Sequence, residues 1–142
     1  MSADLTEAPD LIRALVSGLE DEGFALAGQR GNGLVNRLVE LRRGPLGVRV
    51  TADRGQWWVE LGGQPLGDWF DPDVWEACLD NVPVPMEPSE LEVQVHFVRH
   101  RWHEVANRLD SRDVAECLDR KRSTRARARL GLPPRIENEE ES

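Results

Sequence analysis

An alternation of apolar and polar side chains between residues 24 and 62 constrains the fold of this chain more than any other feature. A period of two is typical of β-strands that turn one face to a core. Short turn sequences interrupt the alternation: Gly31-Asn32-Gly33, Gly44-Pro45 and Asp53-Arg54-Gly55. Strands joined by such turns are antiparallel neighbours. We therefore predict an antiparallel meander of about four strands.

Helical patterns flank this alternation on both sides. Before it, residues 9–22 place apolar side chains on one helical face: Leu11, Ile12, Leu15, Val16 and Leu19. After it, Asp71-Pro72-Asp73 has the composition of a helix start, with Asp71 as the N-cap. The fold class that follows is α+β, with an N-terminal helix, the meander and then about two or three helices packed on the sheet. One sheet face is expected to contact the first helix, and the other face the later helices.

The second half of the chain contains one ambiguous segment. Gly-rich residues 62–70 and Pro-rich residues 81–88 are predicted loops. From Ser89, a predicted N-cap, to Leu109, apolar side chains recur every three or four positions, which indicates a long helix. Residues 91–98 also alternate with a period of two, so a fifth strand is their alternative. We prefer the helix because its period continues unbroken to Leu109.

Length and composition favour one globular domain. A chain of 142 residues buries roughly two-thirds of its unfolded surface and needs no staples to fold. We assign residues 1–132 to a single α+β domain, whose last helix is capped by Ser111. Residues 133–142 are predicted to be an acidic, disordered tail. The sequence shows no apolar run suited to a membrane span or a signal peptide, so we expect a cytoplasmic location.

The cysteines and the net charge narrow the function classes. Cys78 and Cys117 lie far apart and form no CxxC motif, which argues against a zinc or redox site. One disulfide between them is possible, but we expect two free buried thiols, as in a reducing cytosol. The formal net charge of −8 argues against a nucleic-acid partner and suits a neutral or basic protein partner. Because no apolar run is long enough to span a bilayer, we expect no membrane partner.

An acidic and aromatic stretch occupies residues 55–98. It contains four of the five tryptophans and nine acidic residues, but no Lys or Arg. Tryptophans are frequent interface anchors, and a field of one sign accelerates association with a basic partner. We predict partner contacts in this stretch: Trp57, Trp58, Asp68, Trp69, Asp71, Asp73 and Glu76.

This stretch also has a purely structural interpretation. All four tryptophans could belong to the core, and acidic residues near Asp71 could simply complement a helix N-terminus. On an alternating strand, however, Trp57 and Trp58 point to opposite faces. Both are core residues only if both faces of the sheet are covered.

Other candidate sites have simpler explanations. Glu92, His96, His100 and His103 form a row away from the apolar stripe of the predicted long helix, and we interpret this row as a solvated face. Its alternatives are an interface or a zinc site, although the HExxH pattern is absent. The Gly-rich residues 28–33 fit a hairpin turn better than a phosphate loop, and the basic residues 120–129 fit a solvated helix. No catalytic constellation is assembled, so we predict no enzyme activity, no cofactor and no metal.

Several of these features occur together in one known group of proteins. The chain is acidic and runs helix, meander, helix, and its last predicted helix ends in the Arg/Ala-rich sequence RKRSTRARARLG at residues 120–131. A Trp-Phe-Asp segment at residues 69–71 opens a helix. In these respects the chain resembles the immunity proteins of bacterial polymorphic-toxin systems, in particular actinobacterial ones.

The resemblance implies a non-catalytic protein that binds one cognate toxin and blocks its active site or its access to substrate. It implies no fixed set of contact residues, because these families bind through variable surfaces. We expect a monomer or a homodimer whose partner has a basic surface. The main alternative is a small acidic chaperone of a secreted protein, which a strand at residues 91–98 would favour. A small hydrolase is a third class.

Overall fold

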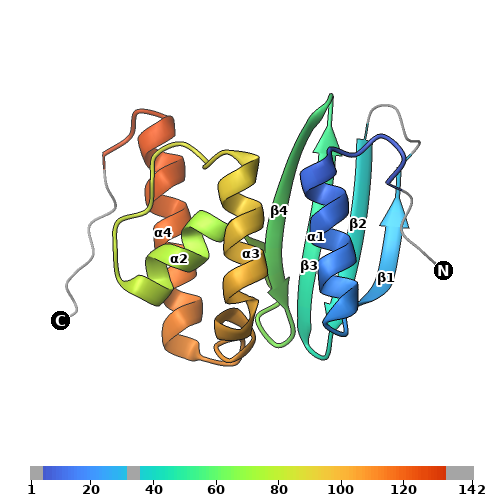
Figure 1. Cartoon of the computed structure of the whole chain (residues 1–142). Helices are drawn as coiled ribbons and strands as arrows, with labels where there is room; N and C mark the ends of the chain where they lie inside the picture. Colours follow the sequence, from blue (N-terminus) through green and yellow to red (C-terminus); the bar gives the residue numbers. More distant parts are fainter. Residues whose placement is uncertain (1–4, 32–35, 134–142) are drawn as a thin grey trace.

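The computed structural model describes residues 5–31 and 36–133, and it confirms the predicted α+β class (Figure 1). The elements in chain order are α1 (Asp10–Asp21), β1 (Ala25–Arg30), β2 (Asn36–Arg43), β3 (Leu46–Asp53), β4 (Gln56–Gly63), β5 (Asp68–Phe70), α2 (Pro72–Asp80), α3 (Leu91–Ala106) and α4 (Arg112–Arg129). Most of the turn predicted at residues 31–33, and nearly all of the acidic tail predicted at residues 133–142, lie outside the described residues.

The strands form one antiparallel meander in the order β1-β2-β3-β4-β5. The predicted turn at Gly44-Pro45 is confirmed. The next turn is confirmed as well, with positive φ at both Arg54 (55°) and Gly55 (84°). Two successive residues at positive φ give a turn whose twist matches that of the flanking strands. The sequence cues therefore located both of these turns correctly.

A fifth strand corrects the prediction that residues 62–70 are a loop. Gly62 and Gly63 continue β4, and Asp68–Phe70 pairs with the end of that strand as β5. A Cβ atom at Gly62 would lie 2.0 Å from the carbonyl oxygen of Asp68. The two strands can approach only because Gly62 has no side chain, and β5 is too short to show a period of its own.

Residues 91–98 are helical, so the preferred prediction is confirmed and the strand alternative is wrong. The N-cap of α3 is Glu90, not the predicted Ser89. Ser89 is bonded elsewhere: its backbone N–H and its hydroxyl both donate to the Asp73 carboxylate, at 2.7 and 2.6 Å. The predicted cap of α4 is confirmed, because the Ser111 hydroxyl accepts a hydrogen bond from the backbone N–H of Val114.

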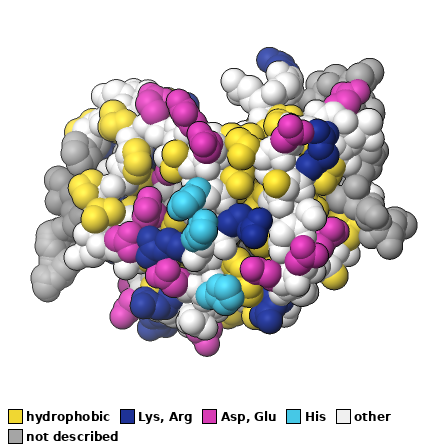
Figure 2. Space-filling model, in the orientation of Figure 1, with side chains coloured by type: hydrophobic (Ala, Val, Ile, Leu, Met, Phe, Trp, Pro, Cys, Tyr) yellow, Lys and Arg dark blue, Asp and Glu magenta, His cyan; other side chains and the backbone are white. Residues whose placement is uncertain are grey.

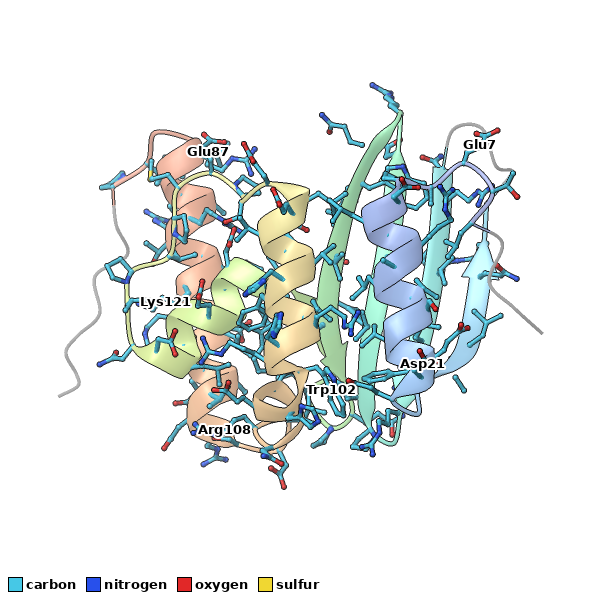
Figure 3. The ribbon with its side chains drawn as sticks, viewed as in Figure 1. Glu7, Asp21, Glu87, Trp102, Arg108 and Lys121 are labelled. Atoms are coloured by element: carbon cyan, nitrogen blue, oxygen red, sulfur yellow. A yellow bond between two sulfur atoms is a disulfide. The ribbon has the colours of Figure 1, made fainter. Side chains whose placement is uncertain are left out.

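The helices cover one face of the sheet. In Figure 1, α1 crosses in front of β2 and β3, α3 runs beside β4, and α2 and α4 lie beyond α3. Inward-facing side chains of β2, β3 and β4 share a single buried cluster with those of α1 and α3, including Val50, Leu15 and Val98. Trp102 of α3 lies near the end of α1 (Figure 3), where its indole N–H donates to the Glu22 carboxylate at 2.6 Å.

The second sheet face does not carry the expected later helices. No side chain that points away from α1 and α3 belongs to the buried hydrophobic core of the described residues. The buried strand residues on this side are glycines. Since α3 shares the first face with α1, none of the described helices is left to cover the second face. A sheet of this kind presents one face to the core and the other to solvent or a partner.

The two cysteines correct another prediction. Cys78 of α2 and Cys117 of α4 form a disulfide, with Cα atoms 5.9 Å apart. The expectation of two free thiols is therefore wrong. Packing of α2 on α4 brings the two residues together, and no local sequence signal marks such a contact.

Within the described part of the chain, we find no helix with the length and apolar character needed to cross a membrane.

The disulfide leads to a stability prediction. It links residues 39 positions apart, which restricts the unfolded chain. Cys78→Ser should lower the free energy of unfolding by about 4 kcal/mol, the chain-entropy value for a loop of this length. Urea denaturation with and without dithiothreitol checks this, because the reductant should reproduce the effect in the native chain and leave Cys78→Ser unchanged. Identical midpoints for the native chain in both conditions would contradict a disulfide in the folded protein.

Candidate functional site: an open sheet face

The uncovered side of the sheet is the candidate functional site, and we call it the open face. It is formed by partly exposed side chains that alternate with the core residues of the strands: Leu38, Glu40, Arg42, Arg49, Thr51, Trp58, Glu60 and Trp69. The pairing register places them in rows across the sheet. Trp58 lies opposite Thr51, and Glu60 lies opposite Arg49.

Trp69 lies across two glycines on the open face. Gly62 pairs with both Gly47 and Trp69, so the three residues form one row. A Cβ atom at Gly47 would lie 2.7 Å from Cη2 of the Trp69 ring. The Arg49 guanidinium stacks on this ring, with its Cζ atom 4.1 Å from the centroid. The indole is thus held against the sheet by two glycines and a cation–π contact.

The packing of the Trp69 indole on Gly47 can be tested by adding one methyl group at position 47. Gly47→Ala should push the indole away from the sheet, because no Cβ atom tolerates an approach of 2.7 Å, at a cost of about 1–3 kcal/mol in stability. The indole N–H resonance of Trp69 should shift in a proton–nitrogen correlation spectrum. Gly28→Ala is the matched control, since a Cβ atom at Gly28 would meet nothing within 4 Å. An unchanged Trp69 resonance in Gly47→Ala would contradict this packing.

A row of alternating charges crosses the centre of the open face. Glu40, Arg49 and Glu60 are direct neighbours on β2, β3 and β4. Arg42 donates from Nε to Glu40 at 2.6 Å, so Glu40 is already neutralised. The Nε atom of Arg49 is buried and has no hydrogen-bond partner. Among the described residues, the Glu60 carboxylate forms no hydrogen bond or ion pair.

The protonation of Glu60 reflects this setting. Burial raises the pKa of its carboxyl above the ordinary value, and the nearby Asp71 carboxylate raises the pKa further. Arg49 acts in the opposite direction but does not cancel these effects. Glu60 is therefore an incompletely neutralised carboxylate at the middle of an otherwise solvent-facing sheet.

A hollow of about 330 Å³ adjoins Trp58. Its apolar lining includes Leu38, Thr51, Ala52 and Trp58, and charged side chains such as Arg30 lie at its border. Among the described residues, the Trp58 indole has no aromatic partner and no hydrogen bond. A large amphipathic ring beside an apolar hollow is the usual form of an interface anchor.

The structure separates the predicted partner-contact residues into two groups. Trp58 and Trp69 lie on the open face. Trp57 lies on the opposite face, where it is half-buried and packs against the core. The alternation of β4 therefore places adjacent tryptophans on different sides of the sheet, as the sequence indicated.

The four predicted acidic contacts are engaged by arginines of α3 and α4. Arg122 binds Asp68 at 2.9 Å, and this hydrogen bond lowers the pKa of the Asp68 carboxyl. Arg101 lies 3.8 Å from Glu76. Although residues 55–98 contain no base, their carboxylates meet bases from later in the chain. Much of the acidic field that the sequence suggested is thus neutralised within the molecule.

Asp71 and Asp73 form a buried cluster with Arg125. The Arg125 guanidinium binds Asp71 and lies 3.4 Å from an Asp73 oxygen. Both Arg125 and Asp73 are buried. Burial raises the pKa of Asp71, although Arg125 opposes the change. The cluster ties the start of α2 to α4, directly after β5, and so fixes the strand that carries Trp69.

The histidine row lies on the other side of the molecule. His96, His100 and His103 are exposed on α3, and histidine side chains are visible near the centre of the helix-side surface in Figure 2. The His96 and His100 rings are 4.2 Å apart, whereas His103 stacks on Trp102 at 3.6 Å. In residues 5–31 and 36–133, we find no cluster of three potential metal ligands.

Sequence reasoning missed several open-face residues: Leu38, Glu40, Arg42, Arg49, Thr51 and Glu60. A signal was present, since Glu60 shares the parity of Trp58 on its strand. Its neighbours on β2 and β3 follow once the hairpin register is known. The row spans three strands, so its members are not contiguous in the sequence.

Comparison with known proteins does not identify the chain. It matches no protein-family model, no curated protein and no solved structure. The open face is therefore the main guide to function.

Proposed function

We propose that this chain is a non-catalytic binding protein that holds a protein partner on the open face. In the form that the resemblance suggests, the partner is a toxin, and binding blocks its active site or its access to substrate. The observation that carries the proposal is the pair of tryptophans, Trp58 and Trp69, on a sheet face without a covering helix. Partly exposed tryptophans supply large contact areas at low cost in conformational entropy.

The chemistry of the open face supports a protein partner. It combines aromatic rings, both signs of charge and an apolar hollow, which is the usual composition of an interface core with a polar rim. A nucleic-acid partner would require a basic surface, and here Arg42 is neutralised by Glu40. Residues 91–98 are helical, which removes the feature that would have favoured a chaperone.

We retain the cytoplasm as the proposed location, because that is where an immunity protein protects its cell. The disulfide between Cys78 and Cys117 is more typical of oxidising compartments. Alkylation of intact cells with a thiol reagent, followed by cell fractionation, measures the oxidation state of the two cysteines and the compartment of the protein. Protected cysteines in a protein that fractionates with the periplasm or the medium would contradict the cytoplasmic proposal.

Neutralisation of a toxin is tested in three steps. The native chain is used to capture partners from its host, and each candidate is expressed alone and together with this chain. The proposal expects one stoichiometric partner that arrests growth when expressed alone and is harmless when expressed with the native chain. Trp58→Ala should fail to restore growth while accumulating to the same level. A partner that is equally harmless without this chain would contradict the toxin proposal.

A further inference from the structure

Glu60 is a carboxylate of the open face that has no hydrogen bond or ion pair among the described residues. Along β4 it lies two residues from Trp58, and on its other side Gly62 carries the Trp69 row. The carboxylate is thus flanked by two indoles on the same face. Arg42 is engaged by Glu40, and Arg49 stacks on Trp69. Neither arginine of the open face forms an ion pair with Glu60.

We propose that the partner inserts a basic side chain, Arg or Lys, beside Glu60, with an adjacent apolar side chain in the hollow next to Trp58. This inference rests on the proposed function and names the chemistry of the contact. A half-buried carboxylate attracts a cation by direct hydrogen bonding, and the face of the neighbouring Trp58 ring adds a cation–π attraction, whereas the Trp69 ring already carries Arg49. Ion pairing would also relieve the cost of holding Glu60 charged in a partly dry place.

The sequence predicted that the basic partner contacts Asp71, Asp73 and neighbouring acids. Arg125 already occupies those two carboxylates, and Asp73 is buried. The basic contact therefore moves from the start of α2 to the centre of the sheet, where Glu60 has no internal partner among the described residues.

Glu60→Gln separates this role from a purely structural one. Because the pKa of Glu60 is raised in the folded state, its ionised form costs stability at neutral pH, and this cost disappears as the pH falls below that pKa. Glu60→Gln should therefore be at least as stable as the native chain at neutral pH, with the difference vanishing in acid. The charged groups that act on the Glu60 carboxyl are Arg49 of β3, Asp68 of β5, Asp71 before α2 and Arg122 of α4.

The binding test uses linear peptides displayed on phage and selected against the native chain. Selected peptides should share an Arg or Lys next to an apolar residue. A synthetic peptide from the selection should bind Glu60→Gln about tenfold or more weakly by calorimetry, as expected for loss of one member of a close charge pair. Glu92→Gln is the matched control, because Glu92 is exposed on α3, and it should bind the peptide normally.

The outcomes distinguish this inference from the proposed function. Peptides that lose binding with Trp58→Ala but not with Glu60→Gln would overturn the basic contact and leave the open face as the binding site. Peptides unaffected by Trp58→Ala, or a selection that yields none, would count against both. If single-stranded RNA bound the native chain and not Trp58→Ala, a protein partner on this face, and the basic side chain with it, would be rejected.

Discussion

Trp58→Ala is expected to weaken partner binding by about 2–4 kcal/mol, or roughly 30- to 1,000-fold in Kd. The indole is partly exposed beside an apolar hollow and lacks internal aromatic or hydrogen-bonding partners among the described residues. Its removal therefore costs the folded chain little, about 1 kcal/mol or less. Titration calorimetry with the captured partner measures the affinity, and urea denaturation measures the stability.

The adjacent residue provides the matched control. Trp57 lies on the opposite face and packs against the core. Trp57→Ala should lower the free energy of unfolding by about 2 kcal/mol, yet the folded variant should bind the partner with near-native affinity. If Trp57→Ala impaired binding and Trp58→Ala did not, the assignment of the open face as the interface would be wrong.

Arg125→Met is expected to destabilise the fold by about 3–5 kcal/mol, the usual cost of removing one member of a buried ion-pair cluster. Arg125 is buried, and its loss would leave the Asp71 and Asp73 carboxylates without their cation. Thermal and urea denaturation measure the effect. Arg122→Ala is the control, since its pair with Asp68 is about half exposed and is worth less than about 1 kcal/mol.

The loss of stability in Arg125→Met should depend on pH in a predictable direction. Removing the cation raises the pKa of Asp71 above its already raised value, because Arg125 is the main charge that lowers it. Without its cation the Asp71 carboxylate costs most when it is ionised, so the loss of stability should be largest near neutral pH and shrink as the pH falls. A deficit that is independent of pH would show that Arg125 acts through packing alone.

Much of the fold could be predicted because its cues are local. Period-two alternation, short turns and the Ser111 cap each depend on residues close in sequence. The disulfide and β5 could not be predicted in this way. Cys78 meets Cys117 only after α2 packs on α4, and β5 exists because Gly62 allows another backbone to approach.

The candidate site was predicted in part for the same reason. Adjacent tryptophans on one strand must point to opposite faces, so the sequence indicated that Trp57 and Trp58 differ. The pairing of Asp71 and Asp73 with Arg125 is a contact between residues 52 or more positions apart, and it was invisible in the sequence. The acidic character of residues 55–98 therefore overstated the field available to a partner.

The most direct test of the open face compares two baits that differ only at position 58. Native chain and Trp58→Ala are expressed in the host at equal levels, captured, and their bound proteins quantified by mass spectrometry. We expect one partner that is stoichiometric on the native bait, reduced at least tenfold on Trp58→Ala, and retained on Trp57→Ala. Equal recovery of that partner on the native and Trp58→Ala baits would contradict the claim that the open face binds it.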